Sequence, residues 1–236
     1  MAQKKLQRFE AIKFLPNVLQ YPEGMAGHWN DFFKNSHPIT LELACGKGEY
    51  TIGLAEIFPT RNFIGVDIKG NRIYVGAKKC LEAGISNAAF LRTDITQIAS
   101  YFSWEEVEEI WLTFPDPQLR NSRSKKRLTH PRFLRLYQQF LISRGKIHLK
   151  TDSPVLFDFT MLVIEMYGLT LHESIDDVYA SAQIGKELEI KTHYENLDIA
   201  RSERVHYLCF SLPDSSLPSI DHILHERIMK NAEQVG

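Results

Sequence analysis

Apolar and polar positions along this chain alternate between two periods. Segments 39–44 (ITLELA) and 62–67 (NFIGVD) have the pattern of buried strands, and segment 49–58, which follows Gly46 and Gly48, has the spacing of a helix. This succession predicts a strand–helix–strand unit, in which a helix packed on the sheet joins two parallel strands.

The same alternation continues through most of the chain. Further strands are expected at 88–92, 108–114, 146–151, 168–174 and 205–212, and further helices at 70–83, 95–102, 133–141 and 153–167. The helix over 133–141 is expected to begin after a Thr129-His130-Pro131 signal and to end at Gly145. The pattern predicts an α/β fold: a Rossmann-like, doubly wound sheet of about seven mostly parallel strands, with helices on both faces and a ligand at the strands' carboxyl ends.

The length of the chain favours a single domain. Its 236 residues, 44% of them hydrophobic, suffice for one large core. We expect one domain over 1–236, with an N-terminal extension (1–38), a core (39–212) and a C-terminal tail (213–236). The polar, irregular segment 176–204 has the character of an excursion that faces substrate.

Charge is distributed unevenly along the chain. The formal net charge of −1 means that a nucleic acid would have to be bound by a local patch. Segment 118–135 supplies one, because it contains no acid and carries Arg120, Arg123, Lys125, Lys126, Arg127, Arg132 and Arg135. Taken alone, such a run is more often a solvated surface.

The cysteines and the absence of targeting signals bear on disulfides, metal binding and location. Cys45, Cys80 and Cys209 are odd in number and far apart, which argues against a disulfide framework and against a metal site. The sequence shows neither a signal peptide nor a run of about 18 apolar residues. We therefore expect a soluble, cytoplasmic protein that does not enter a membrane.

Four acids lie in or just after successive strands: Glu42, Asp67, Asp94 and Asp116. The glycine turn after the first strand would let a ligand approach the backbone, but position 51 is Thr where a dinucleotide fingerprint needs a third glycine. Asp67 is placed to accept ribose hydroxyls and Asp94 to lie against adenine, although each alone could be a helix N-cap. Together the four acids indicate an adenosine cofactor without a pyrophosphate, and S-adenosylmethionine is such a cofactor.

Asp116 also stands between Pro115 and Pro117, which stiffen the backbone at the end of the 108–114 strand. The basic segment follows directly. A rigidly held acid beside cations suggests chemistry on a polyanion.

These motifs resemble the bacterial tRNA (guanine-N7-)-methyltransferases, which are class I S-adenosylmethionine-dependent methyltransferases. The resemblance spans about residues 41–212. It rests on LELACGKGEY (41–50), Gly65-Val66-Asp67, FPDP (114–117) with the basic run to Leu128, HLKTD (148–152), and Thr192-His193-Tyr194-Glu195.

The resemblance implies a role for each matching position. Cofactor contacts are implied at Glu42, Asp67, Asp94 and Asp116, beside the turn at Gly46 and Gly48, with Asp116 also the catalytic acid. Substrate contacts are implied at Arg120, Asp152, Thr192, His193, Tyr194 and Glu195. The implied reaction is tRNA modification, giving N7-methylguanosine in the variable loop, with no metal and no obligate protein partner.

Two parts of the sequence depart from the family pattern. Ala44-Cys45 stands where the family often has Gly and another small residue. Gln118-Leu119-Arg120 stands where the family usually has Trp-Pro-Lys. Arg120 keeps the positive charge, but a guanidinium and an ammonium contact phosphates and bases differently.

Guanine N7 already carries a lone pair, so methylation needs no base, and the product ring gains positive charge. We therefore interpret Asp116 as an orienting group that stabilises this charge. Asp152 and Glu195 could hold the guanine N1 and N2 donors, or Asp152 could cap a helix. Arg123, Lys125, Lys126 and Arg127 are interpreted as a patch for tRNA phosphates.

Several alternatives stay open at the level of sequence. The chain could methylate an adenine amino group, or it could be a non-catalytic RNA-binding partner with a degenerate cofactor fold. Lys4, Lys5 and Arg8 could form a disordered arm for RNA or be solubilising residues. The choice of tRNA, and whether the chain is a monomer or a homodimer, are also open.

Overall fold

The computed structural model describes residues 2–192, 195 and 204–235. Within this part the strands form one eight-stranded sheet in the order β1-β4-β3-β2-β5-β6-β8-β7. Its strands are β1 (Val18–Gln20), β2 (Ile39–Leu43), β3 (Asn62–Asp67), β4 (Ala88–Arg92), β5 (Val107–Thr113), β6 (Leu141–Thr151), β7 (Thr170–Ile175) and β8 (His206–Ser211). Neighbours from β1 to β6 pair in parallel, and β8 runs antiparallel to both β6 and β7.

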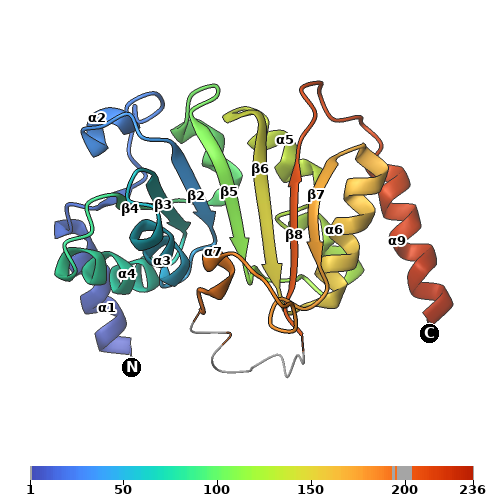
Figure 1. Ribbon diagram of the computed structural model, residues 1–236. Coiled ribbons are helices and arrows are strands. Elements are labelled where there is room, and N and C mark those ends of the chain that lie inside the picture. The colour runs from blue at the N-terminus through green and yellow to red at the C-terminus, as the bar shows by residue number, and fades with distance from the viewer. Residues whose placement is uncertain (1, 193–194, 196–203, 236) are drawn as a thin grey trace.

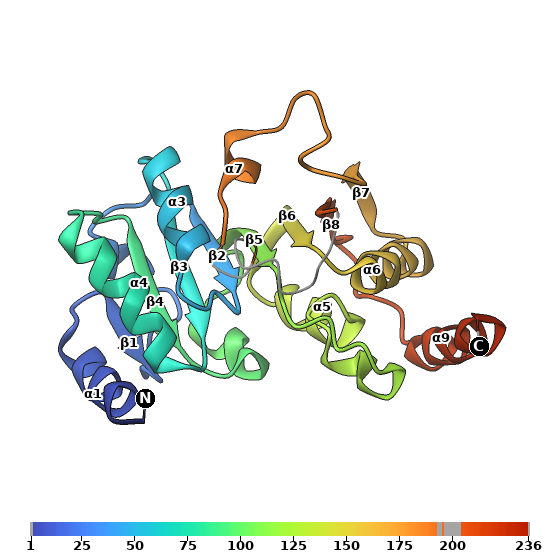
Figure 2. The ribbon, with the colours of Figure 1, turned by 90° about the horizontal axis from the view of Figure 1, so that it is seen from below.

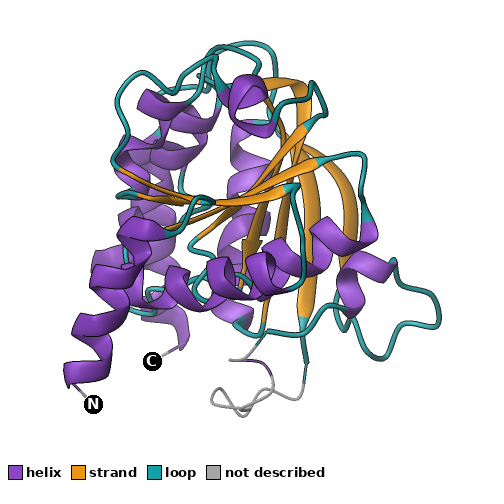
Figure 3. Cartoon of the chain, turned by 90° about the vertical axis from the view of Figure 1, so that its left-hand side faces the viewer, coloured by secondary structure: helices purple, strands orange, loops and turns teal. Residues whose placement is uncertain are grey.

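Helices cover both faces of this sheet (Figure 3). They are α1 (Ala2–Ala11), α2 (Trp29–Phe33), α3 (Glu49–Ile57), α4 (Gly70–Glu82), α5 (Pro131–Tyr137), α6 (Pro154–Tyr167), α7 (Lys186–Glu189) and α9 (Asp221–Val235). The helices α1 and α9 lie beyond opposite edges of the sheet (Figure 1). The predicted doubly wound, mostly parallel α/β fold is confirmed.

Two hydrophobic cores result from the alternation of side chains along the strands. On β5, Ile110 and Leu112 belong to a core completed by α5, α6 and α9, whereas Trp111 faces the opposite core beneath α3, α4 and α7. The strand is buried on both faces, as expected for a central strand of a doubly wound sheet.

The strand count exceeds the prediction by one. The additional strand, β1, lies in the predicted N-terminal extension and pairs with β4 through Val18 to Gln20. Three half-buried residues give too short a pattern for detection from sequence. The segment that carries Lys4, Lys5 and Arg8 forms α1 and is therefore not an unstructured arm.

The helix predicted over 133–141 was placed too far along the chain. The helix α5 ends at Tyr137, and β6 already begins at Leu141. Gly145 lies inside this strand, where the β5–β6 register shifts and where a Cβ would come within 2.9 Å of the Glu108 carbonyl oxygen. The glycine therefore allows close strand packing and does not end a helix.

The order of the strands reverses between β2 and β5, which are neighbours in the sheet. In doubly wound sheets a crevice opens at this point, outside the strands' carboxyl ends. These ends face the lower edge in Figure 1, where α7 also lies.

Candidate active site

The turn after β2 has a backbone that few residues adopt. Ala44, Gly46 and Gly48 all have positive φ, and a Cβ on Gly48 would lie 2.4 Å from the Phe90 ring. Gly46 N–H donates to Asp67 Oδ2 at 2.9 Å, so the acid at the end of β3 fixes this turn. The predicted glycine turn and Asp67 thus meet directly.

Glu42 is buried beneath the turn. Its Oε2 accepts the Thr51 N–H at 2.7 Å and the Thr51 hydroxyl, and its Oε1 accepts the Thr113 hydroxyl at 2.7 Å. Burial raises the pKa of Glu42 to about 7, although these hydrogen bonds oppose the shift. Thr51, the residue that argued against a dinucleotide site, holds this carboxylate in place.

Asp67 and Asp94 differ in their hydrogen-bond partners. Asp67 Oδ1 accepts the Lys69 N–H at 2.8 Å, so both of its oxygens accept backbone bonds. Asp94 caps the short 3-10 helix Ile95–Tyr101, because its Oδ1 accepts the N–H and hydroxyl of Thr96. Hydrogen bonds from Thr96 lower the pKa of Asp94, which keeps the carboxylate charged.

Two adjacent cavities open at the strands' carboxyl ends. One, of about 240 Å³, is bounded by residues that include Glu42, Asp67, Asp116 and Thr192. The other, of about 220 Å³, is bounded by Asp94 and by apolar side chains that include Ile68, Ile95, Leu128 and Phe133. Ala44 and Asp67 line both cavities, so the two adjoin. We call the pair the cleft; its acidic end is the cavity with four carboxylates, which Lys47, Lys69 and Arg72 also line, and its apolar end is the other cavity.

Asp116 lies on an unusual turn at the acidic end of this cleft. Phe114 and Gln118 have positive φ, and the Phe114 N–H donates to the Lys150 carbonyl at 2.8 Å. Asp116 is exposed, and its Oδ1 accepts the Gln118 N–H at 3.0 Å. The turn therefore presents this carboxylate to the cavity and to solvent.

The basic segment is not uniformly exposed. Arg120, Arg123, Lys125 and Lys126 face solvent, whereas Arg127 is only 2% exposed. The Arg127 guanidinium donates to the Pro117 carbonyl at 3.1 Å and to the Gln118 carbonyl at 3.2 Å, and it lies over the Phe159 ring at 4.5 Å. The assignment of Arg127 to a phosphate-binding surface is therefore corrected: Arg127 braces the turn that carries Asp116.

The remaining predicted substrate residues lie at the same edge. Ser153, not Asp152, caps α6, since the Ser153 hydroxyl accepts the Leu156 N–H at 3.3 Å, so the interpretation of Asp152 as a cap is wrong. Thr192 and Glu195 exchange hydrogen bonds of 3.2 Å between the N–H of each and the side chain of the other, as in a capping box. His193 and Tyr194 lie outside the described residues.

Sequence reasoning missed Lys150. This residue is fully buried at the end of β6, and its ammonium contacts segment 176–195. The sequence offers no clear signal for it, because β6 also carries Arg144, Lys146 and His148, so that one more polar residue on this strand does not stand out.

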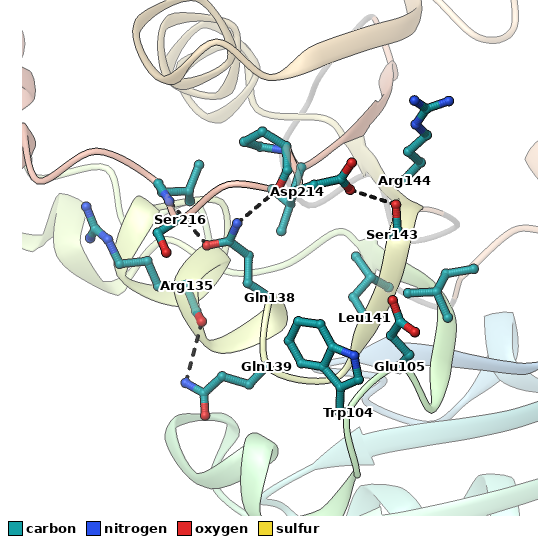
Figure 4. Close-up of a pocket in the computed structure, with 14 residues that line it drawn as sticks. Trp104, Glu105, Arg135, Gln138, Gln139, Leu141, Ser143, Arg144, Asp214 and Ser216 are labelled. Atoms are coloured by element: carbon teal, nitrogen blue, oxygen red, sulfur yellow. Dashed lines mark hydrogen bonds between the residues drawn. The ribbon is translucent and has the colours of Figure 1, made fainter.

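A larger cavity, of about 630 Å³, lies at the other edge of the sheet (Figure 4). It is bounded by Trp104, Leu141 at the start of β6, and Leu212 beyond the end of β8. Because β8 runs antiparallel to β6, the start of β6 and the end of β8 lie at the same edge of the sheet, which is the edge away from the four acids. Of the residues singled out from the sequence, Arg135 lines this cavity, and its guanidinium is paired with Asp221 at 2.7 Å.

Metal-binding groups and membrane-spanning helices are both absent from the described part of the chain. Among them, no group of three or more His, Cys, Asp or Glu side chains is arranged to hold a metal ion. Within the same part of the chain, no helix combines the length and the apolar character needed to cross a membrane.

Comparison with known proteins identifies close relatives. Residues 36–209 match the family model described as "Putative methyltransferase". The chain is 48% identical to the tRNA (guanine-N(7)-)-methyltransferase of Porphyromonas gingivalis, over 85% of this chain and 86% of that protein. It is 46% identical to the protein of the same name from Bacteroides fragilis, over 90% of this chain and 87% of the other.

Among solved structures, the 16S rRNA methyltransferase KamB is similar with a TM-score of 0.62 and 13% identity, over 84% of this chain and 99% of that one. At this identity the likeness shows a shared fold. The sequence relatives are much closer and match nearly the whole chain, so the chain belongs to the family of tRNA (guanine-N(7)-)-methyltransferases.

Proposed function

We propose that this protein transfers a methyl group from S-adenosylmethionine to N7 of a guanine in tRNA. The observation that carries the proposal is the cleft at the switch point of the sheet, in which Asp116 and Glu42 border one cavity and the exposed cations follow Asp116 along the chain. The names of the close relatives supply the substrate. The tRNA variable loop and a cytoplasmic location, both expected from the sequence analysis, belong to this proposal.

The residues of the cleft suit the proposed cofactor. Carboxylates of Glu42, Asp67 and Asp116 line the acidic end, where ribose hydroxyls would find hydrogen-bond acceptors and a sulfonium cation would find negative charge. Ile68, Ile95 and Phe133 line the apolar end together with Asp94, as a planar base with polar edges requires. When bound, the cofactor supplies an electrophilic methyl carbon.

The remaining work falls to the protein. Methyl transfer is an in-line displacement, so aligning the two reactants and excluding water provide most of the rate increase. N7 would use its own lone pair to form the new carbon–nitrogen bond while the methyl–sulfur bond breaks, which leaves S-adenosylhomocysteine as a neutral thioether and the guanine ring positively charged. Asp116 stabilises this charge without accepting a proton.

Exposed Arg120, Arg123, Lys125 and Lys126 contact the tRNA backbone in this proposal, and Asp152, Thr192 and Glu195 lie nearer the guanine. Arg120 replaces the lysine usual in the family, and its planar guanidinium can form two parallel hydrogen bonds with one phosphate. His193 and Tyr194 are proposed as substrate contacts from the family resemblance alone.

The test is transfer of a tritiated methyl group to tRNA from a strain that lacks N7-methylguanosine. The modified nucleotide is then located by chain cleavage at N7-methylguanosine and by nuclease mapping. We expect incorporation at one guanosine. Methylation of an adenine would contradict the assignment of the base, and no incorporation into the whole tRNA pool would favour the non-catalytic alternative.

A further inference from the structure

Lys150 is a completely buried lysine whose ammonium is fully occupied. It donates to the Leu188 carbonyl at 2.9 Å, the Ile190 carbonyl at 2.9 Å and the Tyr179 hydroxyl at 3.1 Å. An ammonium has three protons, so every donor is matched. Burying a charge is costly unless it is paired in this way, which indicates a built site and not incidental packing.

Electrostatic contacts add to these hydrogen bonds. The Lys150 Nζ lies 3.6 Å from Glu195 Oε2 and between 5.3 and 5.6 Å from the ring centres of Tyr50, Phe114 and Tyr179. Aromatic faces at this distance attract a cation. Burial lowers the pKa of Lys150 to about 8, and the charge of Glu195 opposes that shift.

The hydrogen-bond and ion-pair partners of the Lys150 ammonium all belong to the excursion between β7 and β8. From β7 the chain runs out over the sheet and returns at α7, which lies beside α3 (Figure 2). Regular structure in the described part of the excursion before Thr192 is limited to the four residues of α7. The ammonium of Lys150 is thus one attachment of this segment, together with the buried side chains of Val178 and Leu188 and the hydrogen bond from the Tyr50 hydroxyl to the Glu187 carbonyl.

Through Glu195, the same contact reaches the cleft. Glu195 Oε1 accepts the Tyr179 hydroxyl, and Oε2 accepts the Thr192 N–H. Thr192 lines the cavity that Asp116 also borders. The main-chain carbonyl of Lys150 also accepts the N–H of Phe114, at the start of the Asp116 turn. Lys150 therefore contacts two segments that contribute to the lining of this cavity.

We propose that Lys150 is a positioning residue, whose ammonium holds Glu195 and the excursion so that Thr192 keeps its place in the lining of the cavity that Asp116 also borders. Glu195 is oriented by Lys150 and Tyr179, and it transmits that orientation to Thr192. This inference rests on the proposed function for its catalytic readout, and the contacts themselves can be measured without catalysis.

The experiment compares Lys150→Met, which keeps the length and removes the charge, with Lys146→Met as control. Lys146 lies on the same strand and is exposed. We expect Lys150→Met to lower kcat/KM for tRNA by about tenfold or more, while S-adenosylhomocysteine affinity changes by less than about threefold. Lys146→Met should leave both unchanged.

A double-mutant cycle separates positioning from general loss of stability. Adding Glu195→Gln to Lys150→Met should lower kcat/KM for tRNA by less than about twofold further, because the two residues act through one contact. Additive losses would overturn the inference. If Lys150→Met does not fold, Tyr179→Phe removes only the bridging hydroxyl, and turnover within about twofold of the parent would equally overturn it.

Hydrogen exchange distinguishes this inference from the proposed function. In the protein without ligand, Lys150→Met should increase exchange at amides 178–192 and leave β2 to β5 unchanged. If the parent protein fails to methylate tRNA but shows this change, the proposed function fails and the positioning role stands. Unchanged exchange would contradict the positioning role alone.

Discussion

At the scale of single residues, the acids of the cleft have different surroundings. Glu42 and Asp67 are buried and accept hydrogen bonds from the protein, so they shape the turn after β2 as well as line the cavity. Asp116 is exposed, and Gln118 N–H occupies its Oδ1. Among these three carboxylates, Asp116 is best placed to meet a charge that develops on an incoming base.

Replacing Asp116 tests this role. We expect Asp116→Ala to retain S-adenosylmethionine binding within about tenfold, or ~1.4 kcal/mol, while kcat falls by about a hundredfold or more. Asp116→Asn is the matched variant, because an asparagine oxygen can still accept the Gln118 N–H but carries no charge. Both kcat and cofactor affinity are measured. Full turnover in Asp116→Asn would show that the turn matters and the charge does not.

At the scale of elements, the short 3-10 helix Asn121–Lys126 presents its cations to solvent, and Arg127 directly after it points inward. The segment therefore has two functions in one run of sequence. Its exposed side chains can meet phosphates, and its buried guanidinium braces the Asp116 turn through Pro117 and Gln118.

Charge reversal at Lys125 and Lys126 tests the exposed part of the segment. We expect the double change to Glu to raise the KM for tRNA and to reduce the slope of log KM against log salt by about one for each lost phosphate contact. The control is Lys78→Glu with Lys79→Glu on α4, where two exposed lysines undergo the same change of charge. Equal salt slopes in both variants would mean that Lys125 and Lys126 do not contact tRNA phosphates and are ordinary solvent-exposed residues.

At the scale of the whole molecule, the cleft lies where the sheet's strand order reverses, between β2 with its α3 and β5 with the Asp116 turn. A cofactor bound there would contact both halves of the sheet. Such a ligand binds only the folded chain and should therefore stabilise the entire domain by mass action.

Thermal unfolding measures this effect. At a concentration of S-adenosylhomocysteine one hundred times its Kd, the folded state should gain ~2.7 kcal/mol, which for a chain of this length corresponds to a rise in Tm of about 5–10 °C. Adenosine diphosphate at the same concentration is the control. A larger rise with adenosine diphosphate than with S-adenosylhomocysteine would contradict the choice of cofactor.

From β2 to β7, the sequence alone determined the succession of strands and helices and the acids in or just after the strands, apart from the end of α5 and the short 3-10 helix Asn121–Lys126. The helix predicted to end at Tyr167 ends there, and the strands at 62–67 and 88–92 have the predicted bounds. These features follow from local causes, because side-chain periodicity, proline and glycine act on residues close together in the chain. Since parallel strands place their carboxyl ends at one edge, the order of strands was enough to bring the acids together.

Only the tertiary structure decided which residues of similar type are exposed and which are buried in a structural contact. Lys126 and Arg127 are neighbours in sequence, but one is exposed and the other is buried against Phe159, because the fold brings α6 beneath that position. Lys150 and Glu195 pair across two different elements of the chain. Burial and charge pairing depend on contacts between distant segments, which the local pattern of a sequence does not encode.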